Sequence, residues 1–400
     1  MTRLLALLAG MALVAGGCAG GNRIQERTVR VDYREDEFAS YFWRFFPSSV
    51  ALHPGDAVAF RQEWTGEPHT VTLGRLVDEA LPKVDALFEK YEGVETGPPE
   101  LLEQAEREFA EATRGLPTFD VYSGKVAQNG AQPCFLSEGT PPEDPDTPCP
   151  ESARRPPAFD GRQSYHSSGF IPFRGPQGNT YRVRLSPDIA PGTYQYFCLL
   201  HFPFMRGRIE VRPPGTPIPP QSELNEQARA EIKKLAAPLR RAYRQARSGQ
   251  ARTAGLELPL PVAGYHSGEE YTVAVNEFVP RTLSVRANET ITWTIVGAHT
   301  ISFNVPRYLP IYLVDGGGRV VRNPKIDPPA GGSPRPPPVD FTSGPVEIDG
   351  GKWNGEGFFS SGLIGSEPIS RYSLRVSRPG RYSFACLIHP PMVGTLIVRR

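Results

Sequence analysis

The stretches GTYQYFCLLHFPFMRGRIEV (192–211) and GRYSFACLIHPPMVGTLIV (380–398) decide the fold, because they are two versions of one pattern. In each stretch apolar and polar residues alternate, a short loop carries cysteine, histidine and methionine, and the alternation then resumes. Alternation with a period of two predicts strands that are buried on one face, and the loop between them predicts a hairpin. The chain therefore carries two related β-hairpins, one in each half.

Three further pairs of segments agree between the halves and occur in the same order. They are FFPSSVALHPGDAVAFRQEW (45–64) with EFVPRTLSVRANETITWTI (277–295), PHTV (68–71) with AHTI (298–301), and YHSSGFI (165–171) with FFSSGLI (358–364). The first pair shows alternating apolar residues around a Gly-Asp or Asn-Glu turn, which is typical of paired strands. We therefore expect a mainly β protein in which one β domain is duplicated.

Length and composition agree with this expectation. A chain of 400 residues is long enough for at least two domains. The 40 glycines and 43 prolines suit short strands joined by turns better than a helical bundle. Lysine and arginine number 44 against 43 acidic residues, so there is no basic excess that would favour binding to nucleic acid.

Helical periodicity occurs in two places. Apolar residues recur every three or four positions between 75 and 114, which predicts a helical hairpin inserted in the first domain. Residues 222–248 carry an apolar stripe and a basic face, which predicts a helix between the domains; its basic face is either solvated or in contact with anionic lipid. The expected organisation is a signal segment (1–18), a tether (19–28), a first domain (29–212), a Pro-rich and helical linker (213–262) and a second domain (263–400).

The N-terminus has the features of an export signal. Arg3 precedes an apolar run that ends at Ala15, and small residues then lead to Cys18. The run is shorter than the roughly 20 apolar residues that span a bilayer. Its end resembles the lipobox of bacterial lipoproteins, with Ala15 where that motif prefers leucine. The resemblance implies cleavage before Cys18 and lipid attachment to its sulfur, and therefore an extracytoplasmic protein anchored to the membrane; simple secretion is the alternative.

Export also bears on the other cysteines, because disulfides persist in oxidising compartments. Cys134 and Cys149 bracket a loop rich in proline and acidic residues that no core would hold in place. We expect them to form a disulfide, which for a loop of about 15 residues contributes roughly 3 kcal/mol. Cys198 and Cys386 remain, and both lie in the repeated hairpin loop.

Each half supplies one distant histidine and then cysteine, histidine and methionine in a single loop. The two sets are His69, Cys198, His201 and Met205, and His299, Cys386, His389 and Met392. Two imidazoles, a thiolate and a thioether form a soft donor set, and His2Cys with a weak axial methionine is the arrangement of blue copper sites. Zinc also binds cysteine and histidine, but a thioether suits it poorly.

These motifs resemble the cupredoxins, the small blue copper proteins that include plastocyanin, pseudoazurin and amicyanin. The loop CLIHPPM (386–392) is similar to that of amicyanin, and CLLHFPFM (198–205) is one residue longer. The resemblance implies a Greek-key β-sandwich in each half, with a type 1 copper centre that carries single electrons. Thr70 and Thr300 follow the distant histidines, where many members have asparagine.

The resemblance also implies how partners reach the copper. In cupredoxins the loop histidine lies at the surface, inside an apolar patch where redox partners dock. His201 and His389 would occupy that place, and redox proteins such as a c-type cytochrome or a membrane oxidoreductase would be the partners. The apolar neighbours that would form the docking patches are Phe202, Pro203, Phe204, Pro390 and Pro391.

Other functions fit the sequence less well. Two-domain copper oxidases and nitrite reductases place histidines beside the blue-site cysteine, whereas Phe197, Leu199, Ala385 and Leu387 stand there in this chain, which contains no His-x-His pair. A copper storage or delivery lipoprotein would favour Met-rich tracts, and the chain has four methionines. A metal-free adhesion sandwich would leave both quartets without a purpose. We therefore expect an electron carrier rather than an enzyme.

Overall fold

The computed structural model describes residues 24–91, 98–119, 125–171, 179–253, 256–266, 272–305, 312–324, 346–364 and 369–400. Cys18, the predicted signal segment and the tether up to residue 23 lie outside these residues. Among the described helices, none is both long enough and apolar enough to cross a membrane.

The first half contains two sheets. A four-stranded sheet has the order β3-β1-β5-β9, and a six-stranded sheet has the order β4-β11-β10-β6-β8-β7. The strands are β1 (Glu26–Val31), β3 (Phe45–Phe46), β4 (Ser49–Leu52), β5 (Ala57–Gln62), β6 (Thr72–Leu73), β7 (Cys134–Leu136), β8 (Tyr165–Ser167), β9 (Thr180–Arg184), β10 (Gly192–Phe197) and β11 (Arg206–Val211).

The second half also contains two large sheets, with the orders β2-β15-β14-β17-β23-β21 and β16-β25-β24-β18-β22. Two short hairpins, β12-β13 and β19-β20, stand apart from them. The strands are β2 (Ser40–Phe42), β12 (Ala251–Thr253), β13 (Leu256–Leu258), β14 (Val262–His266), β15 (Val273–Val279), β16 (Thr282–Arg286), β17 (Thr290–Ile295), β18 (Ser302–Phe303), β19 (Tyr312–Val314), β20 (Val320–Arg322), β21 (Val346–Trp353), β22 (Phe359–Ser360), β23 (Ser370–Val376), β24 (Gly380–Ala385) and β25 (Val393–Arg399).

The two halves share one strand order. The run β4-β11-β10-β6-β8 matches β16-β25-β24-β18-β22, and each run starts with a parallel pair followed by antiparallel pairs. The run β3-β1-β5-β9 matches β15-β14-β17-β23 in the same way, with a parallel pair in the middle. The expectation of a mainly β fold is confirmed.

Each half buries its core between its own two sheets. In the first half Phe60 of one sheet and Tyr196 of the other belong to one cluster, and their rings meet edge to face with centroids 4.9 Å apart. In the second half Trp293 and Phe384 do the same at 5.8 Å. Two face-to-face sheets around one core make a β-sandwich.

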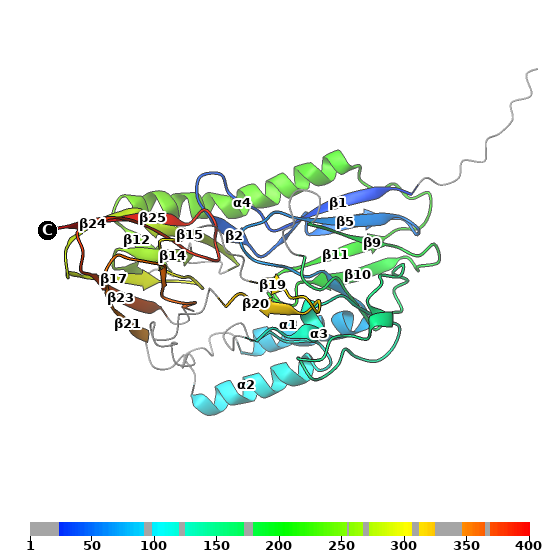
Figure 1. Cartoon of the computed structure of the whole chain (residues 1–400). Coiled ribbons are helices and arrows are strands. Elements are labelled where there is room, and N and C mark those ends of the chain that lie inside the picture. Colours follow the sequence, from blue (N-terminus) through cyan, green and yellow to red (C-terminus); the bar gives the residue numbers. More distant parts are fainter. Residues whose placement is uncertain are drawn as a thin grey trace, which may run out of the picture.

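The predicted helices are present. The inserted hairpin consists of α1 (Arg75–Lys90) and α2 (Pro99–Ala112), and the linker helix is α4 (Gln221–Arg247). A short α3 (Gln128–Ala131) and a 3-10 turn (Glu151–Ala153) complete the described helices. Figure 1 shows α4 lying along both halves, and its apolar stripe packs against β3 and β15.

One strand crosses between the halves. β2 lies inside the range expected for the first domain, yet it pairs with β15, so that Tyr41 faces Ala274 at the edge of a second-half sheet. The side chains of Phe38 and Phe42 pack with α4 in a cluster that joins both halves. The N-terminal segment therefore ties the halves together, and no single boundary in the sequence separates their packing.

The predicted disulfide between Cys134 and Cys149 is confirmed. Its two Cα atoms are 5.6 Å apart, within the usual range for a disulfide. The bond closes the loop that leads from β7 towards β8, and both cysteines are buried beside α1.

Candidate metal centres

Three members of the first quartet converge at the end of the first sandwich. Cys198 follows β10, and His201 lies in the turn that leads to β11, while His69 arrives from the loop after β5. The Cys198 sulfur is 3.9 Å from His69 Nδ1 and 3.5 Å from His201 Nδ1, and the two Nδ1 atoms are 3.1 Å apart. Three soft donor atoms thus form a buried triangle.

The second quartet repeats this triangle closely. The Cys386 sulfur lies 3.8 Å from His299 Nδ1 and 3.7 Å from His389 Nδ1, and the two Nδ1 atoms are 3.2 Å apart. All three residues are buried. The two halves therefore place the same donors at nearly the same separations.

The triangles have the size that a metal ion requires. An ion held by nitrogen at about 2.0 Å and by sulfur at about 2.3 Å in a trigonal plane separates its donors by roughly 3.5–3.7 Å. The observed separations of 3.1–3.9 Å bracket that range. Histidine that ligates through one nitrogen normally donates its other N–H to an oxygen. All four rings do so, which fixes the orientation in which Nδ1 faces the site.

The methionines lie in the same loops but their role as axial ligands stays a prediction. Met205 and Met392 are fully buried in the core clusters that contain Cys198 and Cys386. Backbone hydrogen bonds from each cysteine N–H to the methionine carbonyl, at 2.8 and 3.0 Å, close the two loops. These hydrogen bonds hold the backbone of each methionine next to the backbone of its cysteine.

A threonine secures each cysteine sulfur from the neighbouring loop. The Thr70 N–H donates to the Cys198 sulfur at 3.3 Å, and the Thr300 N–H donates to Cys386 at 3.4 Å. Each threonine hydroxyl accepts the N–H of the residue after the cysteine, at 2.8 Å in both halves. Threonine thus links the two ligand loops in the position where many cupredoxins have asparagine.

The electrostatics favour thiolates. Burial by itself raises the pKa of Cys198, but the charges and hydrogen bonds of His201 and His69 outweigh it and hold that pKa well below the usual value. The same balance, with hydrogen bonds from His299 and His389, lowers the pKa of Cys386. A thiolate is the form that binds metal.

The surroundings of the distant histidines, His69 and His299, differ between the halves. His69 Nε2 lies 3.0 Å from the carboxylate of Asp32, a fully buried residue that follows β1 with φ +66. The strand that corresponds to β1 is β14, and it has Gly264 at the matching position, with φ +69. A side chain at Gly264 would overlap His299 Nε2. In place of a carboxylate, His299 Nε2 has the carbonyl oxygen of Val296 at 3.1 Å.

The pKa values record this difference. Burial lowers the pKa of His69, but the hydrogen bond to Asp32 and the contact with Cys198 reverse the shift and raise it to about 10. Burial dominates at His299, whose pKa is lowered although Cys386 opposes the shift. The first triad therefore has a buried carboxyl group beside it that the second triad lacks.

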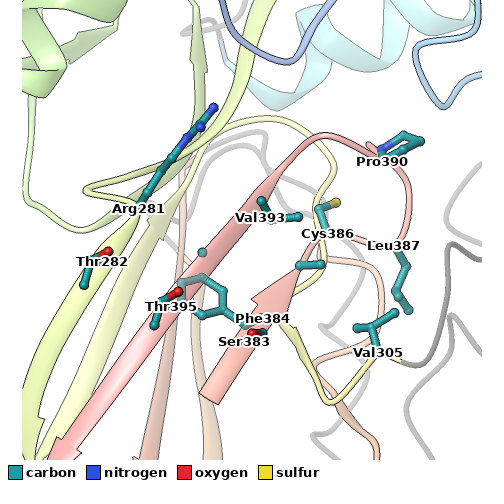
Figure 2. Close-up of a pocket in the computed structure, with 12 residues that line it drawn as sticks. Arg281, Thr282, Val305, Ser383, Phe384, Cys386, Leu387, Pro390, Val393 and Thr395 are labelled. Atoms are coloured by element: carbon teal, nitrogen blue, oxygen red, sulfur yellow. The ribbon is translucent and has the colours of Figure 1, made fainter. Parts of the chain in front are cut away.

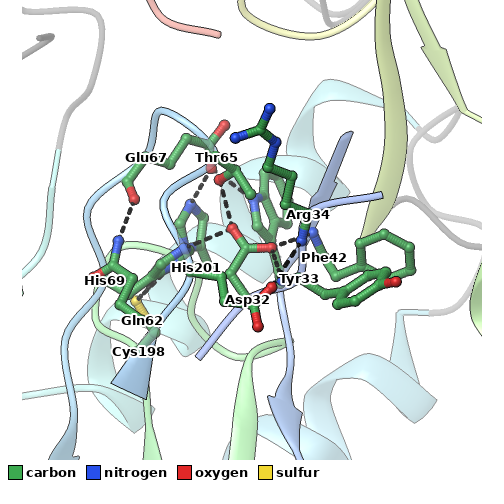
Figure 3. Close-up of polar contacts among 12 residues, drawn as sticks. Asp32, Tyr33, Arg34, Phe42, Gln62, Thr65, Glu67, His69, Cys198 and His201 are labelled. Atoms are coloured by element: carbon green, nitrogen blue, oxygen red, sulfur yellow. Dashed lines mark hydrogen bonds and ion pairs between the residues drawn. The ribbon is translucent and has the colours of Figure 1, made fainter. Parts of the chain in front are cut away.

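The loop histidines face each other rather than solvent. His201 and His389 are only 7% and 1% exposed, so the surface position that the resemblance implied is wrong for both. His201 Nε2 lies 3.1 Å from one oxygen of Glu67, and His389 Nε2 lies 3.3 Å from the other (Figure 3 shows the first site). The two sandwiches meet here, with one carboxylate between their metal loops.

Aromatic residues from the N-terminal segment complete this junction. The indole of Trp43 stacks on His201 with centroids 4.5 Å apart, and its N–H donates to Glu67 at 2.8 Å. Tyr41 stacks on Trp43 in turn, and its ring centroid is 6.4 Å from that of His389. Hydrogen bonds lower the pKa of Glu67 well below its usual value although burial opposes the shift.

The residues predicted to dock partners differ in their exposure to solvent. Phe204 is 41% exposed, Pro203 is buried, and Phe202, Pro390 and Pro391 are half-buried. The inserted helical hairpin covers the first patch, where Phe109 of α2 contacts Phe202 and Phe88 of α1 contacts Phe204. A pocket of about 500 Å³ lies beside the second triad and is lined by Cys386, Pro390 and Val393, among others (Figure 2).

Sequence reasoning missed Asp32, Trp43 and Glu67. The repeat contains a signal for Glu67, because the second half has Gly297 two residues before its distant histidine, where the first half has the acid. Asp32 and Trp43 lie outside the matched segments used to align the halves and offered no comparable signal.

Solved cupredoxin structures match part of this chain. No protein-family model matches the chain, and no curated protein is similar enough to match. Among solved structures, a reduced Cu(I) form of an amicyanin variant matches with 18% identity over 31% of this chain and 73% of that chain, at a TM-score of 0.17. A purple cupredoxin from Nitrosopumilus maritimus matches with 17% identity over 31% of this chain and 83% of that chain, at a TM-score of 0.16. Alignments with such TM-scores do not bear on function.

Proposed function

We propose that this chain is an electron-transfer protein with two type 1 copper centres, one in each sandwich. The observation that carries this proposal is the pair of buried His–Cys–His triangles, in which every ligand histidine has its second nitrogen hydrogen-bonded to oxygen. His69, Cys198 and His201, with Met205, would hold the first copper, and His299, Cys386 and His389, with Met392, would hold the second. Copper in this donor set takes up and releases a single electron.

The surroundings of the triads support a carrier rather than an enzyme. A rigid, buried ligand set suits electron transfer, because the ligands need not move when the charge of the metal changes. Within the described residues, the groups of His, Cys, Asp and Glu that are arranged to bind a metal are the two triads themselves.

We further propose that the protein acts outside the cytoplasm, attached to the membrane by lipid on Cys18. The disulfide between Cys134 and Cys149 supports an oxidising compartment. A c-type cytochrome or a membrane oxidoreductase would then be the redox partner. Replacing Cys18 with alanine should release the protein from the membrane fraction, and mass spectrometry of the N-terminal peptide would identify the lipid.

The visible spectrum of the copper-loaded protein tests the central proposal. Wild type should show an intense blue band, and Cys198→Ser and Cys386→Ser should each remove part of it, because the band requires copper bonded to thiolate. A protein that binds two copper ions without colour would refute type 1 copper and favour storage or delivery. Oxygen or nitrite consumption by the loaded protein would instead support an enzyme.

A further inference from the structure

A single carboxylate contacts a ligand histidine of each triad. Glu67 accepts from His201 Nε2 at 3.1 Å with one oxygen and from His389 Nε2 at 3.3 Å with the other. Each ring presents Nδ1 to its own triad and Nε2 to Glu67. The path from one triad to the other therefore consists of two aromatic rings, two hydrogen bonds and one carboxylate, without a gap.

We propose that Glu67 joins the two centres into one redox unit, so that an electron passes between them inside the chain. This inference rests on the proposed function, because it requires copper in both triads. In the transfer one centre is reduced as the other is oxidised, one electron moves, and both Nε2 protons remain on their rings. The step therefore balances without a further oxidant, reductant or proton acceptor.

The structure around Glu67 holds this link rigid. The Trp43 N–H donates to the same carboxylate at 2.8 Å, while its ring stacks on His201 at 4.5 Å between centroids. Gly66, immediately before Glu67, has φ +122, and a side chain there would overlap the carbonyl oxygen of Ile388 in the second metal loop. The backbone must approach that loop closely to deliver the carboxylate, which explains why a glycine stands there.

Both loops present exposed side chains to an external reductant. The inserted helices pack on the first loop through Phe202 and Phe204, and Phe204 is still 41% exposed. The pocket beside Cys386 leads towards the second centre, and Val393 at its wall is 46% exposed. An electron from outside can therefore enter at either centre and reach the other across Glu67.

Reduction kinetics of the copper-loaded chain test the bridge. Ascorbate is mixed with oxidised wild type, Cys386→Ser and Cys198→Ser, and bleaching of the blue band is followed in each. If the centres were independent, the wild-type trace would equal the sum of the two single-site traces. In wild type we expect the slower of the two single-site components to be lost, because that centre would be reduced through the other one.

The bleaching trace of Glu67→Gln should equal the sum of the two single-site traces, and both blue bands should persist. Its amide accepts one hydrogen bond through oxygen, but its NH2 opposes the N–H of the other histidine, so one link is broken. Glu63→Gln is the matched control, because Glu63 is a partly exposed carboxylate of the same segment that pairs with Arg30 and contacts neither triad. It should behave as wild type.

Failure of the bridge and failure of the proposed function give different results. Absence of the blue bands would refute the copper centres, whereas normal bands with a wild-type trace equal to the sum would overturn the bridge alone. An unchanged wild-type acceleration in Glu67→Gln would overturn it as well. Should that variant lose its colour, NMR of the reduced wild type decides: two ring N–H protons protected from exchange support the bridge, and rapid exchange of both overturns it.

Discussion

The buried carboxylate beside the first triad leads to a quantitative prediction about its redox potential. A negative charge stabilises the oxidised, more highly charged metal, so Asp32→Asn should raise the potential of the first centre. Asp32 lies roughly 7 Å from a metal at Nδ1, because the 3.0 Å contact with His69 is extended by the ring and by a bond of about 2 Å. At an effective dielectric constant of about 20, one unit charge at that distance is worth about 2 kcal/mol.

That energy corresponds to a rise of roughly 90 mV. The potential is measured by spectroelectrochemical titration in the Cys386→Ser background, so that only the first centre contributes. Asparagine tolerates φ near +66 and keeps an oxygen that can accept the N–H groups of Tyr33 and Phe42. Its NH2 replaces the oxygen that faces His69, and loss of that hydrogen bond also makes the imidazole a weaker donor, which raises the potential in the same direction.

The control is Asp56→Asn, which removes another buried carboxylate at the opposite end of β5, where it caps a turn through the His53 N–H. It should leave the potential within about 20 mV of wild type, since the charge is distant and screened. A potential that stays constant or falls in Asp32→Asn would refute the reasoning, because the sign follows from the charge alone.

Three further predictions concern stability. Gly66→Ala should cost about 2–4 kcal/mol of unfolding free energy, because it combines a positive φ with overlap on the second metal loop. Burial lowers the pKa of His166 to about 4, so stability should fall by about 2 kcal/mol between pH 7 and pH 5, where only the unfolded state binds the proton; His166→Phe should remove that loss. Replacing Cys134 and Cys149 together with alanine should cost roughly 3 kcal/mol without changing the blue bands. Denaturant unfolding measures all three.

Each of these predictions has a result that contradicts it. Gly55→Ala shares a positive φ but meets no neighbour, so an equal cost in both variants would show that the contact at Gly66 is unimportant. A pH dependence that persists in full in His166→Phe would assign it to other groups. A disulfide-free protein as stable as wild type would mean that the loop is held by packing alone.

The spacing of residues along the chain was enough to predict most strands and helices, the candidate ligands and the disulfide. The alternating pattern in 192–211 and 380–398 predicts β10-β11 and β24-β25, and the periodicity in 75–114 and 222–248 predicts α1, α2 and α4. The repeated order of histidine, cysteine and histidine predicts which residues converge, because the hairpin loop brings cysteine and the second histidine together and the repeat pairs each loop with one distant histidine. The proximity of Cys134 to Cys149 in the chain likewise made their pairing predictable.

Such local patterns did not predict the contacts between the two halves. Glu67 and His389 are separated by 322 residues, and whether they meet depends on how two sandwiches pack, which no local period encodes. Packing likewise explains three other features. β2 pairs with a second-half sheet, both loop histidines are buried, and the group next to the distant histidine is Asp32 in the first half but Gly264 in the second. The sequence by itself determined the candidate ligands and the strands that carry them, because both follow from local patterns that occur twice in the same order. Only the tertiary structure decided that the two centres face each other across one carboxylate, because that arrangement arises from surfaces which form only after each half has folded.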